Sequence, residues 1–250
     1  MTTVSTPVQQ VPTIGRAEAA VLAADENDRF VALIRSLTAD EWTRPTDCPE
    51  WDVRALVSHV VGAMEANASI SEFVHQLRAG KKAAGDRPDI DGMTEVQVRE
   101  RSDLGPEALT ARLSAIAPKA ARARKRVPAL VRGLTMKVEV AGAMETWRLG
   151  YLFDIIFTRD TWMHRVDIAR AIARPLAVDA THDGRIVADV VAEWGRRHGQ
   201  PFTLHLEGPA GGAFTCDGPG QTITMDAVEF CRTVSGRAPG TGLLTQEVPF

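Results

Sequence analysis

The stretch that decides the fold is VRALVSHVVGAMEANASI, residues 53–70. Its apolar side chains recur at i, i+3, i+4 and i+7, which places them on one face of an α-helix. These side chains are Val53, Leu56, Val57, Val60, Ala63 and Met64. The pattern predicts a helix that packs this face against other helices, with His59 beside the buried face.

A second long helix is predicted from about residue 146 to residue 173, before Pro175 stops it. Asp160 and His164 on this helix are four residues apart, so their side chains lie about 40° apart around the axis and one turn apart along it. The two side chains can therefore reach one ion together. His59 can face them from the first helix, because metal sites in bundles are built from side chains on facing helices.

The candidate ligands His59, Asp160 and His164 leave coordination positions open for water or substrate, which is typical of catalytic metal sites. Zinc is the first expectation, although imidazole with carboxylate also suits iron, nickel or manganese. Taken alone, each signal is weak: a histidine beside an apolar face is more often a hydrogen-bonded core residue, and Asp-x-x-x-His spacing is common by chance. Asp167 either orients a ligand imidazole, pairs with a neighbouring arginine, or is itself a ligand.

We expect three parts along the chain: a disordered tail over residues 1–13, a helical bundle over 14–175 and a small α+β domain over 176–250. Helical spacing in residues 16–37 and 106–126 completes the four helices of the bundle. The bundle and the domain that follows it define the α+β fold class.

Glycine and proline between residues 80 and 106 indicate a long connection around a short polar helix near 94–101. After residue 178 the pattern predicts a helix, three short strands separated by Gly and Pro turns, and a further helix that ends at Gly236. The last ten residues, 241–250, are expected to form a strand or an extended tail.

The composition limits the classes of function. Apolar residues make up 44% of the chain and charged residues 24%, as in an ordinary soluble globular protein. A net charge of −3, from 29 basic and 32 acidic residues, gives no attraction to phosphate backbones or anionic lipid. No signal peptide and no apolar run of about 18 residues is visible. We expect a soluble, cytoplasmic protein that acts on a small molecule, without nucleic acid or membrane, as a monomer or homodimer.

The three cysteines lie far apart and form no Cys-x-x-Cys pair, so neither a disulfide framework nor a thiolate zinc site is predicted. Cys48 precedes Pro49, and no general base is visibly paired with it. We therefore expect Cys48 to pack at the entry of a helix and not to act as a nucleophile. Any metal must then be held by histidine and carboxylate.

Three blocks of sequence resemble the mycothiol-dependent maleylpyruvate isomerase family, a branch of the DinB-like metal-binding bundles. The first block is the most specific, because it combines Trp42, Pro45, Thr46, Cys48, Pro49, Trp51, Asp52, Val53, Arg54, Leu56, Val57 and His59. The other two are RDTWMHRVDIA, residues 159–169, and EFCRTVSGR, residues 229–237. The resemblance covers nearly the whole chain, from about Arg16 to Phe250.

The resemblance implies a divalent metal ion held by one histidine of the second helix and by a carboxylate and a histidine four residues apart on the fourth. These roles fall on His59, Asp160 and His164. The characterised isomerases of the family have glutamate where this chain has Asp160. The shorter aspartate either binds through one oxygen with shifted helices, binds through water, or weakens the site.

The resemblance further implies mycothiol, a low-molecular-weight thiol, as a cofactor. In the isomerases a thiolate adds to a cis double bond, the adduct rotates, and elimination returns the trans isomer. The family also places an arginine of the C-terminal domain near the metal; Arg237 is the best match and Arg232 the alternate. The expected function is a cis-trans isomerase or thiol S-transferase, with a non-catalytic ligand-binding or regulatory protein and a metal-dependent hydrolase as alternatives.

Overall fold

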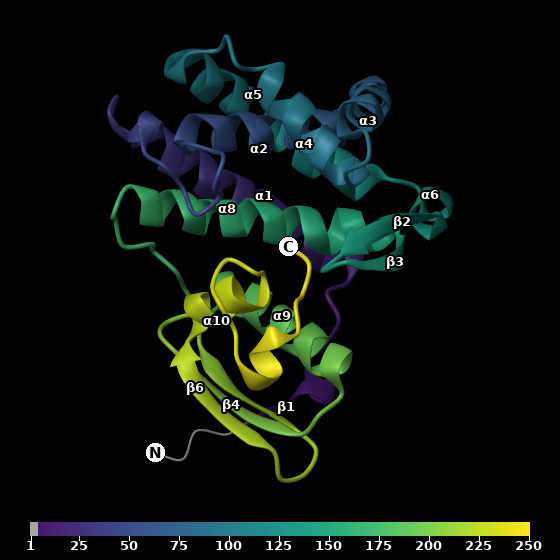
Figure 1. Ribbon diagram of the computed structural model, residues 1–250, viewed down its shortest axis with the longest axis vertical. Helices are drawn as coiled ribbons and strands as arrows, with labels where there is room; N and C mark the ends of the chain where they lie inside the picture. The colour runs from purple at the N-terminus through teal and green to yellow at the C-terminus, as the bar shows by residue number, and fades with distance from the viewer. Residues whose placement is uncertain (1–4) are drawn as a thin grey trace. The chain divides into compact units, whose positions relative to one another are not determined.

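A computed structural model describes residues 5–250, which fold into two compact units (Figure 1). The larger unit, Gly15–Pro175, is mainly helical. The smaller unit combines the described residues up to Ile14 with Leu176–Phe250 and contains a mixed sheet. The predicted α+β fold class is confirmed.

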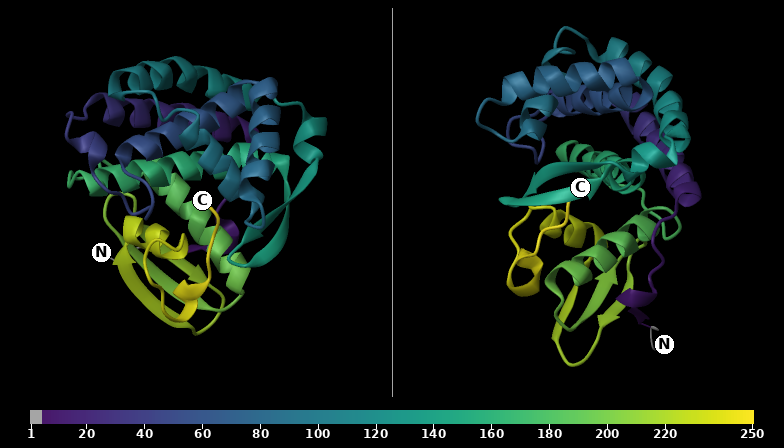
Figure 2. Two further views of the ribbon diagram at one scale, coloured as in Figure 1. Left: turned by 45° about the horizontal axis from the view of Figure 1, so that its top comes forward. Right: turned by 90° about the vertical axis from the view of Figure 1, so that its right-hand side faces the viewer.

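The helical unit contains eight helices, one hairpin and one π-helical segment among the described residues. The elements are α1 (Arg16–Arg35), α2 (Val53–Ala68), α3 (Ile70–Ala84), α4 (Asp89–Arg99), α5 (Pro106–Arg126), α6 (Ala129–Gly133), β2 (Thr135–Val140), β3 (Ala143–Arg148), α7 (Leu149–Tyr151), the π-helical segment Leu152–Ile156, and α8 (Phe157–Ala171). Helices α1, α2, α5 and α8 form the bundle (Figures 1 and 2).

The bundle core is built from the apolar face that the sequence of α2 predicts. Val53, Leu56, Val57 and Val60 are each at most 1% exposed, and they pack with residues of α1, α5 and α8. A buried ion pair adds a fixed contact between α1 and α8, because Arg165 Nε and Nη2 donate to the two carboxylate oxygens of Glu26 at 2.7 and 3.0 Å. The position of α8 in the bundle is therefore fixed by both packing and charge.

The loop before α2 is closed by its own hydrogen bonds. Thr46 Oγ1 donates to the carbonyl of Trp51 at 2.8 Å and accepts from the backbone nitrogen of Cys48 at 3.1 Å. Asp52 then caps α2, because its carboxylate accepts from the backbone nitrogen of Ala55 at 2.8 Å. Threonine and aspartate in this motif thus fix where α2 begins and where Trp51 lies.

Two glycines in the predicted long connection are points of close helix contact and not helix ends. A Cβ atom on Gly92 would lie 2.1 Å from the carbonyl oxygen of Gly80 and 2.5 Å from the backbone nitrogen of Ala84. The connection predicted over residues 80–106 is shorter than expected, because α3 continues through Gly80 to Ala84; the helix predicted near 94–101 is α4, which begins earlier, at Asp89. Glycine here permits close backbone approach.

The hairpin β2–β3 was also missed by the sequence analysis, which placed the start of a helix near Thr146. The two strands pair antiparallel from Thr135 with Arg148 to Val140 with Ala143 (Figure 2, teal). Ala141 and Gly142 join them with φ values of 49° and 77°, the two positive φ angles of a tight two-residue hairpin turn. Alanine in that turn is an unusual signal, and this explains the error.

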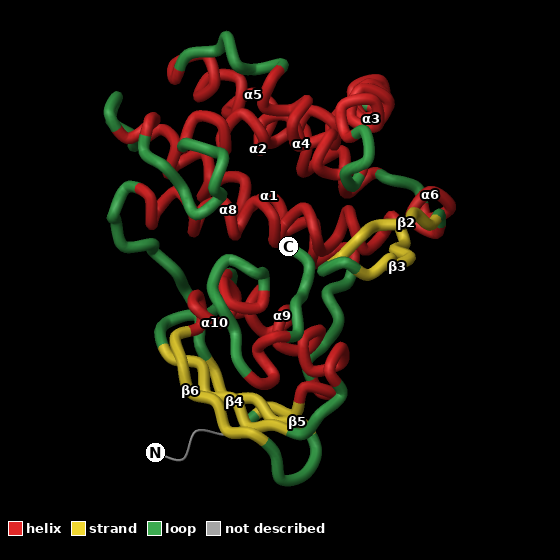
Figure 3. The backbone as a smooth tube through the Cα atoms, viewed as in Figure 1, coloured by secondary structure: helices red, strands yellow, loops and turns green. Residues whose placement is uncertain are grey.

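The smaller unit is a four-stranded sheet with two helices (Figure 3). Its elements are β1 (Thr6–Pro7), α9 (Asp183–His198), β4 (Phe202–Glu207), β5 (Gly212–Cys216), β6 (Gln221–Asp226) and α10 (Ala227–Val234), with 3-10 turns at Val8–Gln10 and Gly242–Thr245. The strand order is β1-β5-β4-β6, with β4 antiparallel to β5 and parallel to β6. Trp194 of α9 packs against Phe202 and Phe230 in its core.

The predicted disordered tail over residues 1–13 needs a correction. Residues 1–4 of that prediction lie outside the described residues. Thr6 and Pro7 pair with Phe214 and Thr215 as a parallel edge strand, and the Val8 side chain is buried. The edge of β5 offers backbone hydrogen-bonding groups that pair with this segment. The segment's sequence of Thr, Val, Gln and Pro gave no sign of this pairing.

Across residues 5–250, no helix combines the length and apolar character needed to cross a bilayer.

Replacing Gly92 by alanine is expected to destabilise the helical unit by about 1–3 kcal/mol, because the new methyl group would force α3 and α4 apart. Gly133→Ala is the control, since nothing lies within 4 Å of a Cβ atom at that position. Chemical denaturation followed by far-ultraviolet circular dichroism measures both. Equal denaturation midpoints for the two variants would contradict the close contact between α3 and α4 at Gly92.

Candidate metal centre

The structure brings His59, Asp160 and His164 together within the helical unit. His59 projects from α2, and Asp160 and His164 project from α8. Asp160 Oδ1 lies 3.6 Å from His59 Nε2 and 3.4 Å from His164 Nε2. Both histidine side chains are buried, while Asp160 is partly exposed. Three donor atoms from two facing helices thus converge on one point.

The spacing of these atoms fits a single metal ion. Zinc–nitrogen and zinc–oxygen bonds of about 2.0–2.1 Å in a tetrahedral site place neighbouring ligand atoms about 3.3 Å apart. The separations of 3.4 and 3.6 Å are close to this value. One oxygen of Asp160 therefore lies at the spacing of a shared metal ligand from the Nε2 atoms of both histidines.

Asp167 supports His164 from behind. Its carboxylate oxygen Oδ2 lies 3.0 Å from His164 Nδ1, and its side chain is fully buried. Of the three roles that the sequence left open for Asp167, the geometry supports the first, which is to accept a hydrogen bond from Nδ1 and leave Nε2 facing Asp160. A carboxylate behind a ligand imidazole also makes that imidazole a stronger donor to a metal.

Cys48 belongs to the surroundings of His164, a placement that the sequence analysis missed. Its sulfur lies 3.7 Å from Asp167 Oδ2. Cys48, His164 and Asp167 also offer ligand atoms within 4.8 Å of one another. Because Asp167 already contacts His164 Nδ1, we interpret Cys48 as a donor to this carboxylate. The motif around Pro49 thus places a thiol near the site, although the residue spacing gave no sign of it.

Gln97 of α4 supports His59 in the same way that Asp167 supports His164. Its side-chain oxygen lies 2.7 Å from His59 Nδ1. Trp51 packs against both imidazoles, with ring centroids 5.1 Å from His59 and 6.3 Å from His164. Both Nδ1 atoms therefore have acceptors, and both Nε2 atoms face Asp160. Gln97 lies in the short polar helix that was predicted near residues 94–101, but nothing in the sequence indicated its contact with His59.

The electrostatics of the site favour a cation. Burial opposes ionisation of Asp160, but the facing imidazoles of His164 and His59 outweigh it and hold the pKa of Asp160 well below its usual range. Burial likewise disfavours the charged form of His164, but Asp160, Asp167 and the Cys48 thiol outweigh it and raise the pKa of His164 well above its ordinary value. The point where these groups meet thus favours a positive charge, which a proton or a divalent metal ion can supply.

The π-helical segment Leu152–Ile156 directly precedes α8. Such segments are uncommon and occur often at functional sites. Arg124 of α5 stabilises this one, because its Nε donates to the carbonyl of Phe153 at 2.8 Å and its Nη2 donates to Thr158 Oγ1 at 2.7 Å. Burial lowers the pKa of Arg124 to about 10. The contacts of Arg124 with Phe153 and Thr158 thus hold the start of α8, the helix that carries Asp160. Helical periodicity cannot predict such contacts.

Arg237, the arginine expected near the metal, lies in the smaller unit directly after α10. Gly236, with a φ of 79°, turns the chain there, and the backbone nitrogen of Arg237 donates to the carbonyl of Arg232 at 2.9 Å. Arg237 is partly exposed. Arg232, the alternate, is buried and donates to Glu229 at 2.6 Å.

A helical bundle that carries two histidines and an aspartate at one point, joined to a small mixed sheet, defines an α+β protein with a candidate metal centre. Residues 23–169 match the family model described as the mycothiol maleylpyruvate isomerase N-terminal domain. The chain therefore belongs to this family. No curated protein sequence matches the chain.

Two solved structures share the fold over nearly the whole chain. A crystal structure of the mycothiol-dependent maleylpyruvate isomerase is 17% identical, with a TM-score of 0.58 over 98% of both chains. A histidine-to-alanine mutant of a mycothiol-dependent maleylpyruvate isomerase is 15% identical, with a TM-score of 0.57 over 93% of this chain and 92% of the other. At these identities the likeness shows the fold, which extends through the smaller unit.

Replacing His59 by alanine is expected to weaken zinc binding by more than about 100-fold, because loss of a ligand exceeds the 10- to 100-fold cost of losing a group that only supports one. His75→Ala is the matched control, since His75 is exposed and pairs with Glu100 at 2.9 Å. Chelator competition on the purified protein measures both affinities. Equal affinities would show that zinc does not bind through His59.

Proposed function

We propose that the protein is a metal- and mycothiol-dependent enzyme that acts on a small carboxylate-bearing molecule by thiolate addition, as a cis-trans isomerase or a thiol S-transferase. The observation that carries the proposal is the convergence of His59 Nε2 and His164 Nε2 on one oxygen of Asp160. Membership of the mycothiol maleylpyruvate isomerase family supports the choice of thiol.

In this proposal His59, Asp160 and His164 hold the ion, with zinc as the first expectation. When bound, such an ion lowers the pKa of a coordinated thiol and keeps it as the nucleophilic thiolate. Three protein ligands leave further coordination positions open. Asp160 is the most exposed of the three, so the open side of the site lies toward this carboxylate.

Trp51 limits the access of water to the site. Its indole lies beside both imidazoles, and the loop that carries it is closed by Thr46. Fewer competing water molecules strengthen electrostatic interactions between the site and a bound anion. The Trp51 indole also restricts the directions from which a thiol can approach the site.

We assign substrate binding to Arg237. A guanidinium binds a carboxylate with two parallel hydrogen bonds and stabilises negative charge that develops on an enolate. Arg237 suits this role better than Arg232, because Arg237 is partly exposed whereas Arg232 is buried.

The test of the proposed function uses the zinc-loaded protein with mycothiol and, as a probe substrate, maleylpyruvate. Turnover is expected only when zinc and mycothiol are both present, and calorimetry is expected to show mycothiol binding that requires the metal. Binding of mycothiol without metal would favour a non-catalytic binding protein. Hydrolysis of an ester or amide probe without thiol would favour a hydrolase. Either result would contradict the proposal.

Arg237→Ala is expected to raise KM for a carboxylate substrate by about 10- to 100-fold, the equivalent of losing one charge-assisted hydrogen bond. Arg196→Ala in the same unit is the control, because Arg196 lies on the exposed face of α9. Steady-state kinetics with the probe substrate distinguishes the two variants. An unchanged KM for Arg237→Ala would remove Arg237 from the substrate site.

A further inference from the structure

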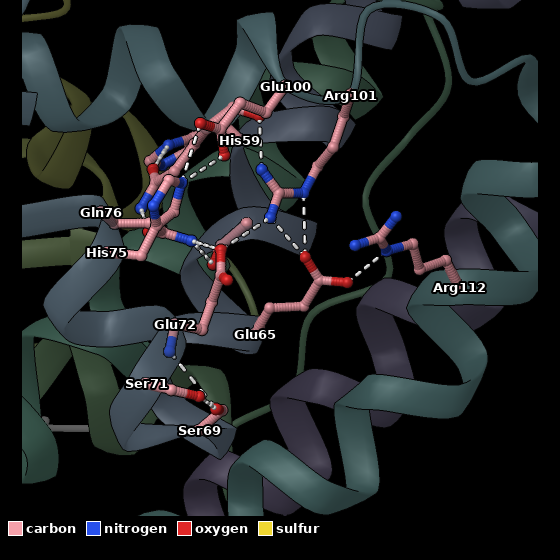
Figure 4. Close-up of polar contacts among 12 residues, drawn as sticks. His59, Glu65, Ser69, Ser71, Glu72, His75, Gln76, Glu100, Arg101 and Arg112 are labelled. Atoms are coloured by element: carbon pink, nitrogen blue, oxygen red, sulfur yellow. Dashed lines mark hydrogen bonds and ion pairs between the residues drawn. The ribbon is translucent and has the colours of Figure 1, made fainter. Parts of the chain in front are cut away.

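Two buried glutamines connect His59 to a charged cluster formed by Glu65, Glu72, Arg101 and Arg112 (Figure 4). Gln97 of α4 and Gln76 of α3 are 1% and 0% exposed. Gln97 Oε1 lies 2.7 Å from His59 Nδ1, and Gln97 Nε2 donates to Gln76 Oε1 at 2.8 Å. Gln76 Nε2 then donates to the carbonyl of Gly62 at 2.9 Å and to Glu72 Oε1 at 2.8 Å.

The donor and acceptor of each hydrogen bond in this series follow from the contacts of Gln76, the residue farthest from His59. The Gly62 carbonyl can only accept a hydrogen bond, so the Gln76 amide group must face it. Gln76 Oε1 then accepts from the amide of Gln97. That contact turns Gln97 Oε1 toward His59, where it can only accept. His59 Nδ1 must therefore be the donor.

These donor and acceptor roles decide which nitrogen of His59 is available to a metal. A neutral imidazole carries one proton, so a proton on Nδ1 leaves the lone pair on Nε2, the atom that faces Asp160. Asp160 Oδ1 is also an acceptor and would draw the proton to Nε2, but it lies 3.6 Å away, beyond the range of a good hydrogen bond. Gln97 at 2.7 Å is the stronger competitor for the proton.

We propose that Gln97 is a positioning residue that holds His59 in the tautomer whose Nε2 binds the metal, and that Gln76 fixes the orientation of Gln97. This inference rests on the proposed metal centre. Gln97 is an amide, so it sets the tautomer without adding a negative charge, whereas Asp167 sets that of His164 with a carboxylate.

The packing around Gly62 keeps Gln97 within reach of His59. A Cβ atom on Gly62 would lie 2.7 Å from Gln97 Cβ, so α4 approaches α2 as closely as the backbone allows. Arg101, one turn after Gln97, donates to the Gln97 carbonyl at 2.8 Å and to Glu65 Oε2 at 3.0 Å. Gly62, three residues after His59, thus contributes both a carbonyl acceptor for Gln76 and the space that Gln97 occupies.

Arg101 and its partners close the outer end of the chain of hydrogen bonds. Arg101 Nη2 lies 3.5 Å from Glu72 Oε1 and also contacts Glu65, which pairs with Arg112 (Figure 4). The cluster holds Glu72 beside the Gln76 amide group, while the Gly62 carbonyl, which can only accept, fixes the direction of these hydrogen bonds.

The test compares the parent protein with Gln97→Met, which keeps the side-chain volume and removes the acceptor. In metal-free protein, ¹⁵N spectra of the histidine rings are expected to show His59 protonated at Nδ1, with the His59 signals assigned by their absence in His59→Ala. In Gln97→Met this single tautomer is expected to be lost. Chelator competition is expected to show zinc binding 10- to 100-fold weaker, about the cost of losing a group that supports a metal ligand.

Two further variants keep the result independent of folding. Gln97→Glu keeps an acceptor for His59 Nδ1 but loses the donor to Gln76 Oε1, so it is expected to keep the Nδ1 proton and to bind zinc more tightly than Gln97→Met. Gln97→Asn keeps the amide but is one methylene too short, so it is expected to behave as Gln97→Met. Lys81→Gln is the control, because Lys81 is an exposed residue of α3 and should leave both readouts unchanged.

The two readouts separate this inference from the metal centre on which it rests. If the parent holds the Nδ1 tautomer and Gln97→Met loses it while neither binds zinc, the positioning role stands and the metal centre fails. If Gln97→Met keeps both the tautomer and the zinc affinity of the parent, the positioning role is overturned.

Discussion

One oxygen of Asp160 lies within 3.6 Å of the Nε2 atoms of two histidines from different helices. Imidazoles from these two helices can share one carboxylate only if α2 and α8 are held at a fixed distance and a fixed rotation about their axes. The core face of α2, the buried Arg165–Glu26 pair and the capped loop before α2 all serve that constraint. Electrostatic attraction across the site supports the same arrangement, since the pKa of Asp160 is lowered and that of His164 is raised. Fold and candidate centre are therefore two consequences of one helix contact.

The sequence predicted those parts that depend on local periodicity. The apolar spacing around His59 gave a helix with the observed buried face, and the four-residue separation of Asp160 and His164 gave a pair on one side of α8. Periodicity could not show that the two helices meet. The resemblance to the family supplied His59 as the third expected ligand, and the structure places its Nε2 opposite Asp160 Oδ1.

The parts that the sequence did not predict depend on contacts between distant segments. Glycines 80 and 92 look like helix breakers until two backbones meet at them, and an Ala-Gly turn gives a weak signal for a hairpin. Gln97 shows the same limit at the candidate site, because a glutamine in a polar segment carries no sign that a histidine 38 positions earlier lies against it. Residues that act through a ligand, and not on the metal itself, are therefore the hardest to find from one sequence.

The strand at Thr6–Pro7 pairs with Phe214–Thr215, so the smaller unit is assembled from segments that lie on both sides of the helical unit in the chain. During synthesis the helical unit, Gly15–Pro175, is complete once Pro175 has left the ribosome. The sheet, by contrast, must wait for β5, and until then its first strand has no partner. The order of synthesis thus favours a folded helical unit before the mixed sheet closes around the N-terminal segment.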